Sequence, residues 1–199
     1  MKIIFISQRL DKVGKYNELR NNIDIRFSLF LKKIGMMPIL IPNNCFQLKV
    51  LFKKIRPKGI ILSPGGDPRE KDKRYEVERL LINYSKKNNI PLLGICRGAQ
   101  ALNLFFGGKI KKINNHVRRN HNLQGMLIKN KIKIKTKCFH EYGIEKSILG
   151  KNLKVLASSK DGSIECFEHI TKKIMGIMWH PERFKKFRKF ELNLIKRFF

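Results

Sequence analysis

The segment PLLGICRGAQ, residues 91–100, contains the side chain best suited to covalent chemistry. An apolar run ends at Cys96, and glycines lie two positions before and two positions after it. Small neighbours of this kind allow a tight turn from a strand into a helix, which exposes the central side chain. The positive end of that helix favours a thiolate, so Cys96 is predicted to be a nucleophile. The alternative is a core cysteine at a strand end, which the two glycines disfavour.

A cysteine nucleophile needs a base, and the base needs a group that orients it. His180 directly follows an apolar run and is followed by Pro181 and Glu182. Residues two apart in an extended chain project to the same side, so Glu182 can bind one imidazole nitrogen while the other faces a thiol. A surface His-Pro-Glu turn is the alternative, but the presence of Cys96 favours a triad of Cys96, His180 and Glu182.

The turn SPGGDP, residues 63–68, follows another apolar run. Glycines there let backbone N–H groups point into a cleft, where an oxyanion forms during acyl transfer. We expect the amides of Gly66 and Arg97 to form this oxyanion hole, and Gly65 to contact the substrate. A Pro-Gly-Gly sequence usually forms only a turn. Its position at the end of a strand, one βα unit before Cys96, favours its interpretation as part of the oxyanion hole.

Short apolar runs alternate with amphipathic stretches in the first half of the chain, which is typical of βαβ units and a parallel sheet. The pattern predicts strands at 2–6, 37–41, 59–62 and 90–95, and helices at 23–34, 46–54 and 74–87. After residue 108 it predicts antiparallel strands at 126–128, 131–137, 153–158, 163–169 and 173–179, a hairpin turn at 161–162 and a closing helix at 183–199. The expected fold is an α/β domain with a mostly parallel sheet and an antiparallel extension.

The 199 residues fit one domain, 1–199, with a single core. No apolar run approaches the roughly 20 residues that a membrane span needs, and the first strand is too short for a signal peptide. Four cysteines show neither a CxxC pair nor a metal-ligand spacing with histidine. We therefore expect a cytoplasmic protein with reduced thiols, no membrane association, no metal and no cofactor. The oligomeric state is left open.

The formal net charge of +29 would by itself suggest nucleic acid, an anionic surface or an anionic substrate as a partner. The excess is mostly lysine, which is dispersed along the chain and accompanied by abundant Asn, Ile and Phe. All four residue types have AT-rich codons. We expect a solvated basic surface that attracts small anionic ligands, and no dedicated nucleic-acid site.

Three blocks, SPGGDP, GICRGAQALNLFFGG and WHPERF, resemble the class I glutamine amidotransferases in order and spacing, and more narrowly their γ-glutamyl hydrolase branch, peptidase family C26. The resemblance spans nearly the whole chain. It implies a flavodoxin-like three-layer α/β/α sandwich and a triad, on the three residues above, that hydrolyses a γ-glutamyl amide. It also implies that Gln100 helps to hold the glutamyl group. The segment FHEY, residues 139–142, which includes His140 and Glu141, matches the segment whose backbone contacts the α-amino and α-carboxylate groups.

The opening ISQRL, the stretch 107–122 and the WHPER ending resemble a subfamily of hydrolases that act on γ-glutamyl-CDP-amidate in capsule phosphoramidate synthesis. This resemblance implies that His116, Arg118, Arg119 and His121 lie near an anionic nucleotide. A basic surface loop is the equal alternative for the arginines. Phe184 stands where the relatives are expected to have an acidic residue, outside the triad.

Two other functions remain open. One is a glutaminase subunit that passes ammonia to a synthetase partner, and the other is an inactive relative that binds nucleic acid through its basic surface.

Overall fold

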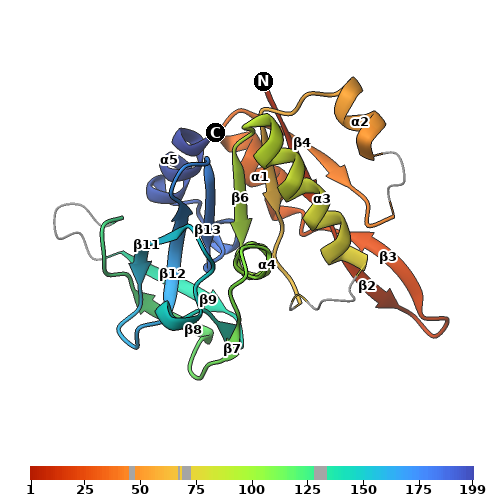
Figure 1. Cartoon of the computed structure of the whole chain (residues 1–199). Coiled ribbons are helices and arrows are strands. Elements are labelled where there is room, and N and C mark those ends of the chain that lie inside the picture. The colour runs from red at the N-terminus through yellow and green to blue at the C-terminus, as the bar shows by residue number, and fades with distance from the viewer. Residues whose placement is uncertain (45–47, 67, 69–72, 128–133) are drawn as a thin grey trace.

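A seven-stranded sheet runs through the centre of the computed structural model, which describes residues 1–44, 48–66, 68, 73–127 and 134–199 (Figure 1). Its order is β11-β12-β13-β6-β5-β1-β4. Five neighbouring strands are parallel: β13 (Ile174–Ile177), β6 (Leu92–Ile95), β5 (Gly59–Leu62), β1 (Lys2–Ser7) and β4 (Met36–Ile41). In chain order these read 2-1-3-4-5, the flavodoxin arrangement, so the predicted fold is confirmed.

Two antiparallel strands extend the sheet beyond β13. They are β12 (Ile164–His169) and β11 (Leu153–Ser158), joined by a turn at the predicted place. Gly162 in that turn has φ +87°, a conformation that glycine adopts without strain.

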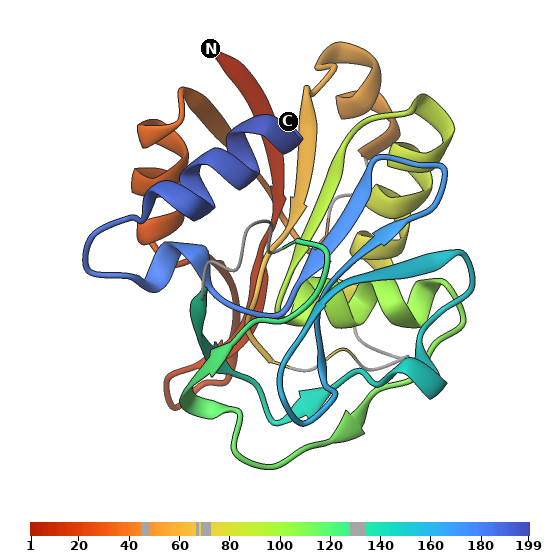
Figure 2. The ribbon, with the colours of Figure 1, turned by 90° about the vertical axis from the view of Figure 1, so that its left-hand side faces the viewer.

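Side chains on the parallel strands alternate between two apolar cores, one on each face of the sheet. In β1, Ile4 and Ile6 belong to one core and Phe5 to the other. Helices α1 (Arg26–Lys33) and α5 (Lys189–Phe198) cover the first core. Helices α2 (Leu48–Lys54), α3 (Lys73–Asn88) and α4 (Arg97–Phe105) cover the second. Figure 2 shows the resulting three layers, with α1 and α5 on the left and α3 and α4 on the right.

Three small antiparallel pairs lie at the lower edge in Figure 1, where the parallel strands end. They are β2 (Arg9–Val13) with β3 (Glu18–Asn22), β8 (Val117–Asn122) with β9 (Lys135–Phe139), and β7 (Lys111–Lys112) with β10 (Tyr142–Gly143). Two 3₁₀ turns, Lys146–Ile148 and Pro181–Arg183, complete the described elements. In open parallel sheets, ligands bind at the carboxyl ends of the strands, so these pairs surround the expected site.

The parallel strands, their helices and strands β11 and β12 follow the predicted positions within a few residues, but the segment between α4 and β11 does not. The strand predicted as antiparallel at 173–179 is β13, which is antiparallel to β12 but parallel to β6. Residues 126–127 form a turn and not a strand, and 128–133 lie outside the described residues. The strand predicted at 131–137 is described from β9, which begins at Lys135 and pairs with β8. No strand was predicted at β8, where a basic surface loop was one of the two alternatives for the arginines. The hairpin of β2 and β3 was not predicted.

The predicted closing helix at 183–199 is too long. Helix α5 begins only at Lys189, because Pro181–Arg183 forms the 3₁₀ turn that follows His180 and leads the chain into α5. The predicted helix at 46–54 is described from Leu48 onward, and residues 46–47 lie outside the described part. None of the helices in the described ranges is both long enough and apolar enough to span a membrane.

Candidate active site

Cys96 occupies the junction between β6 and α4 with φ 51° and ψ −107°. A residue with a Cβ rarely adopts this conformation, so the backbone is strained. The Cys96 amide donates a hydrogen bond to the carbonyl of Ile177 on the neighbouring strand at 2.7 Å. The tight strand-to-helix turn predicted at Cys96 is therefore present, and the role of Cys96 as a nucleophile stays a prediction.

The two flanking glycines are required by close backbone approach. A Cβ on Gly94 would lie 2.6 Å from the carbonyl group of Gly98, and a Cβ on Gly98 would lie 2.2 Å from the carbonyl oxygen of Leu62. Real Cβ contacts do not come this close. The first turn of α4 thus rests directly on β5 and β6, which fixes the direction in which Cys96 points.

The imidazole of His180 lies against Glu182, with 2.8 Å between Nδ1 and Oε1. Both side chains are buried, Glu182 completely. Burial alone would lower the pKa of His180, but the charge of Cys96, a hydrogen bond with its sulfur and the Glu182 carboxylate together raise this pKa to about 9. The three residues predicted as a triad are therefore in contact, and at neutral pH His180 carries its proton beside the sulfur.

A small cavity of about 190 Å³ opens onto these residues. It is lined by Gly65, Gly66, Cys96, Phe139, His140, Glu141, His180 and Arg183. Gly65 and Gly66 have φ +102° and +70°, which turns this backbone in a way that other residues rarely adopt. The predicted contacts Gly65, His140 and Glu141 thus share one pocket with Cys96. Gly66 faces it too, and Arg97 is the residue next to Cys96, so the pair remains the candidate oxyanion hole.

The sequence profile of the glutamine amidotransferase class-I family matches residues 28–199. The chain belongs to the class I glutamine amidotransferase family. The γ-glutamyl-CDP-amidate hydrolase of Campylobacter jejuni subsp. jejuni serotype O:2 is 34% identical over 187 residues, covering 90% of each chain. One subunit of the glutamine-hydrolysing GMP synthase of Pyrococcus abyssi is 34% identical over 155 residues, covering 76% of this chain and 79% of its own.

A crystal structure of a Thermoplasma acidophilum protein assigned as one subunit of GMP synthase superposes with a TM-score of 0.71 at 23% identity. The superposition covers 100% of this chain and 92% of that one. At this level of identity the likeness concerns the fold, and it agrees with the sheet order of the amidotransferase described above.

Two pocket residues of this amidotransferase received no role of their own from the sequence: Phe139 was included only as part of the segment 139–142, and Arg183 was not singled out. The Phe139 ring meets the His180 ring edge-on, with 5.3 Å between centroids. The Arg183 guanidinium lies 4.6 Å from the centroid of the same Phe139 ring, and its Nε is 3.6 Å from Glu182 Oε1. Phe139 thus limits the movement of the base, and Arg183 brings positive charge to the pocket wall. The signal for Arg183 was its place directly after the HPE motif.

A buried arginine–glutamate cluster of Arg74, Glu78 and Arg97 supports the elbow from the α3 side. Glu78 forms ion pairs with Arg97 and with Arg74, the latter at 3.0 Å between Nε and Oε1. Arg74 also donates to the carbonyl of Gly65 at 2.7 Å and to the hydroxyl of Ser63 at 3.0 Å. The cluster therefore joins the residue after the nucleophile to the glycine turn. Neither Arg74 nor Glu78 was singled out from the sequence.

Gln100 lies one helical turn after Cys96 and is buried. Its side-chain amide donates to the carbonyl of Tyr142 at 2.8 Å, while its Oε1 is buried and has no partner among the described residues. Gln100 does not line the cavity as outlined above, but it holds the segment that does. The hydrogen bond to Tyr142 fixes the orientation of the Gln100 side-chain amide and of its unpaired Oε1. A direct role of Gln100 in holding the glutamyl group stays a prediction.

Arg118, Arg119 and His121 all lie on β8 and do not line the cavity of Cys96. Arg118 and Arg119 are exposed, and neither forms an ion pair with a described residue. His121 stacks on the buried ring of His116 with 4.0 Å between centroids. The structure therefore separates these three from the triad pocket, and their contact with a leaving group stays a prediction.

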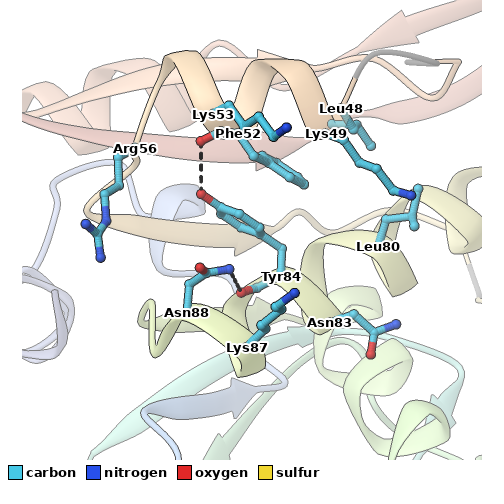
Figure 3. Close-up of a pocket in the computed structure, with 10 residues that line it drawn as sticks. All are labelled: Leu48, Lys49, Phe52, Lys53, Arg56, Leu80, Asn83, Tyr84, Lys87 and Asn88. Carbon is cyan, nitrogen blue, oxygen red and sulfur yellow. Dashed lines mark hydrogen bonds between the residues drawn. The ribbon is translucent and has the colours of Figure 1, made fainter.

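A second hollow, of about 780 Å³, lies between α2 and α3 (Figure 3). The rings of Phe52 and Tyr84 stack in its wall with 3.8 Å between their centroids, and the tyrosine hydroxyl donates a hydrogen bond to the carbonyl oxygen of Phe52 at 3.2 Å. None of the residues drawn in Figure 3 belongs to the Cys96 pocket. This hollow is therefore separate from the proposed chemistry.

Proposed function

We propose that this amidotransferase is a cysteine-dependent hydrolase that cleaves a γ-glutamyl amide and releases glutamate. One observation carries the proposal: Cys96, on a strained elbow, shares a small pocket with a buried His180–Glu182 pair that keeps the imidazole protonated beside the sulfur. A thiolate–imidazolium pair of this kind supplies both a nucleophile and a proton donor.

In the first half of the reaction, the Cys96 thiolate attacks the γ-carbonyl carbon, and the carbonyl oxygen becomes an oxyanion. The amides of Gly66 and Arg97 stabilise this oxyanion. His180 then gives its proton to the leaving nitrogen as the C–N bond breaks, which leaves a glutamyl thioester and a neutral imidazole. Glu182 holds the ring in the required orientation through Nδ1.

In the second half, the neutral His180 takes a proton from water as the water oxygen attacks the thioester. The second oxyanion is stabilised by the same amides and collapses as the C–S bond breaks. Glutamate leaves, and the thiolate–imidazolium pair is restored.

The substrate we propose is a nucleotide-linked γ-glutamyl phosphoramidate, γ-glutamyl-CDP-amidate, as used in capsule synthesis. Support comes from the Campylobacter jejuni hydrolase, whose match covers 90% of both chains. Arg183 in the pocket wall and the exposed Arg118 and Arg119 on β8 are groups that could bind a pyrophosphate. Arginine pairs with phosphate oxygens through two parallel hydrogen bonds, which suits this role.

A second candidate function is a glutaminase subunit that delivers ammonia to a synthetase. The similarity to the GMP synthase subunit of Pyrococcus abyssi favours it. Such a glutaminase is expected to act on free glutamine and to be slow until a partner docks, whereas a free-standing hydrolase is expected to be active alone.

The test measures glutamate release by the purified chain from γ-glutamyl-CDP-amidate and from glutamine at one ionic strength. We expect the nucleotide-linked substrate to have the higher kcat/KM. Replacing Arg118 and Arg119 together by alanine should lower that kcat/KM roughly tenfold or more, as for the loss of one charge-assisted contact. Replacing Lys32 and Lys33, an exposed basic pair on α1, removes the same charge elsewhere and should have little effect.

Equal efficiency with glutamine would refute the nucleotide preference and favour the glutaminase function. No turnover of either substrate, together with salt-dependent binding of RNA or DNA, would instead support the inactive nucleic-acid-binding relative.

A further inference from the structure

Four buried side chains outside the triad converge at one point near the catalytic pocket. His116 precedes β8, Cys138 lies on β9, His140 follows β9 and Glu165 lies on β12. One nitrogen, sulfur or oxygen atom from each of the four lies within 4.8 Å of all the others. We refer to these four residues as the histidine–cysteine cluster.

Each histidine in the cluster is oriented by an acceptor on its outer nitrogen. His116 Nε2 lies 2.7 Å from Asp161 Oδ2, and His140 Nδ1 lies 3.1 Å from the carbonyl oxygen of Tyr142. A histidine that donates its N–H to such an acceptor presents a lone pair on its other nitrogen. Metal-binding histidines are usually held in this way by a carboxylate or a backbone carbonyl.

The inner atoms of the cluster have no hydrogen bonds. His116 Nδ1, His140 Nε2 and Glu165 Oε1 are all buried, and none has a hydrogen bond in the described part of the chain. His116 Nδ1 and Glu165 Oε1 are close enough to form an ion pair when His116 is protonated. Glu165 Oε1 lies 3.3 Å from His116 Nδ1 and 3.8 Å from His140 Nε2. Buried polar atoms are almost always paired. A proton on His116 would satisfy the contact with Glu165 but would leave His140 Nε2 without a partner among the described residues, whereas a cation between the three atoms would satisfy all of them.

We propose that the histidine–cysteine cluster binds a divalent transition metal ion, with Zn²⁺ the best match. Zinc favours four ligands of this nitrogen, sulfur and oxygen chemistry, whereas calcium and magnesium favour oxygen alone. In a tetrahedral zinc site, nitrogen and oxygen ligands with bonds of about 2.0–2.2 Å are separated by roughly 3.3–3.6 Å. The 3.3 Å distance falls in this range, whereas the 3.8 Å distance and the 4.8 Å limit of the cluster require the side chains to move slightly inward on binding. The Cys138 thiol, which now donates to Glu165 Oε2 at 3.4 Å, would lose its proton to the solvent on binding.

The site would be structural. Four protein ligands fill the coordination of zinc and leave no open position for substrate. The ion would tie the hairpin of β8 and β9 to β12 of the central sheet. Because His140 and Glu141 line the Cys96 cavity, it would also fix one wall of that cavity. The sequence showed no metal spacing because the ligands come from segments that are brought together only by folding.

The first measurement is the zinc content of the purified protein, for which we expect about one equivalent per chain. Chelator-treated protein is then titrated with Co²⁺, which gives a thiolate charge-transfer band and intense visible bands in a tetrahedral site. The band should vanish in Cys138→Ala and persist in two controls, Cys96→Ala and Cys166→Ala. Cys166 lies on β12, is buried like Cys138 and is not a member of the cluster.

Two further variants keep the test decisive if Cys138→Ala folds poorly. His116→Gln should lower the apparent Zn²⁺ affinity at least 100-fold, and Asp161→Asn, which alters the contact of Oδ2 with His116, should lower it about 10–100-fold. Zinc should also raise the denaturation midpoint of the wild type and leave that of His116→Gln unchanged.

Protein without zinc and without the cobalt band would overturn the proposal and leave a metal-free ion pair of His116 with Asp161 and Glu165. A band that is lost in Cys96→Ala but kept in Cys138→Ala would overturn it as well, because the metal would then bind the catalytic sulfur.

Discussion

Two buried polar clusters adjoin the catalytic pocket, and they differ in how fully their polar atoms are paired. In the arginine–glutamate cluster, Glu78 binds two arginines, and Arg74 also reaches the glycine turn. In the histidine–cysteine cluster, three inner atoms lack a hydrogen bond among the described residues, and charge is paired only through His116. Burying a charge is costly unless it is paired, so the first cluster can hold the elbow by itself, whereas the second would be completed by the proposed metal ion.

The residues of the two clusters position other groups, whereas Cys96, His180 and Glu182 are the residues proposed to react. Substitution in the arginine–glutamate cluster should lower the stability of the fold whether or not metal is present. Substitution in the histidine–cysteine cluster should lower stability mainly when metal is present. Substitution of a triad residue should instead abolish turnover with little change in stability.

The largest effect is expected from Cys96→Ala, which leaves both clusters intact. Turnover should fall by about 10⁴-fold or more, since the thioester can no longer form. The free energy of unfolding should change little, because a small side chain at a strained turn contributes little packing. Cys166→Ala is the matched control and should retain turnover. Activity retained in Cys96→Ala and lost in Cys166→Ala would remove Cys96 from the mechanism.

His180→Ala should reduce kcat nearly as much as Cys96→Ala, and Glu182→Gln should reduce it less, by about tenfold to a hundredfold. The imidazole transfers protons, whereas the carboxylate sets its tautomer and direction. Steady-state rates at neutral pH measure the difference. If Glu182→Gln matched the wild type, the 2.8 Å contact with His180 would have no catalytic role.

Glu78→Gln should lower the free energy of unfolding by about 3–5 kcal/mol, because two buried arginines lose their counter-charge. Denaturant unfolding of Glu78→Gln and of Glu76→Gln gives the comparison, since Glu76 is exposed on the same helix. Glu165→Gln, measured with a chelator present, should have a smaller effect. An equal effect in both clusters would contradict the distinction drawn between them.

The smallest effect is a loss of activity at alkaline pH. The pKa of His180 is raised to about 9, so the ring loses its proton as pH rises through that value. The leaving nitrogen then lacks a proton donor, and kcat/KM should fall about tenfold per pH unit. The matching contribution to stability is complete below the ordinary value of 6.5 and is lost as pH rises to about 9.

The control for this pH dependence is Cys96→Ser, which removes the charge that raises the pKa of His180. The titration midpoint of the His180 ring, followed by NMR, should move to lower pH in this variant. An unchanged midpoint would show that the sulfur does not form the proposed ion pair.

The parallel sheet was predictable because its signals are local. Strands β1, β5 and β6 are short apolar runs that end in turns, and burial on both faces makes such runs easy to identify. Strand β8, with the sequence VRRNHN, is polar and mostly exposed, and it is a strand only because it pairs with β9. Strands β2 and β3 form a local hairpin, but they carry similarly mixed residues. Polar strands that are stabilised mainly by pairing with each other have no apolar pattern by which a single sequence would identify them.

The same contrast holds for the site. Cys96, His180 and Glu182 belong to two short motifs, so their meeting in one pocket could be predicted from the sequence, and their catalytic roles stay predictions. Glu78 resembles any charged residue of an amphipathic helix, and its partner Arg97 is distant in sequence. Cys138 and Glu165 likewise meet only in the fold.

The conformation of Cys96 also has an evolutionary consequence. Its φ of 51° suits glycine, so selection for catalysis keeps a side chain where stability alone would remove it. Cys96→Gly should therefore be more stable than Cys96→Ala, by about 1 kcal/mol. A lineage of this chain that no longer needed the reaction would be expected to drift toward glycine here. The residue type at position 96 would then indicate whether a protein descended from this chain is still an enzyme.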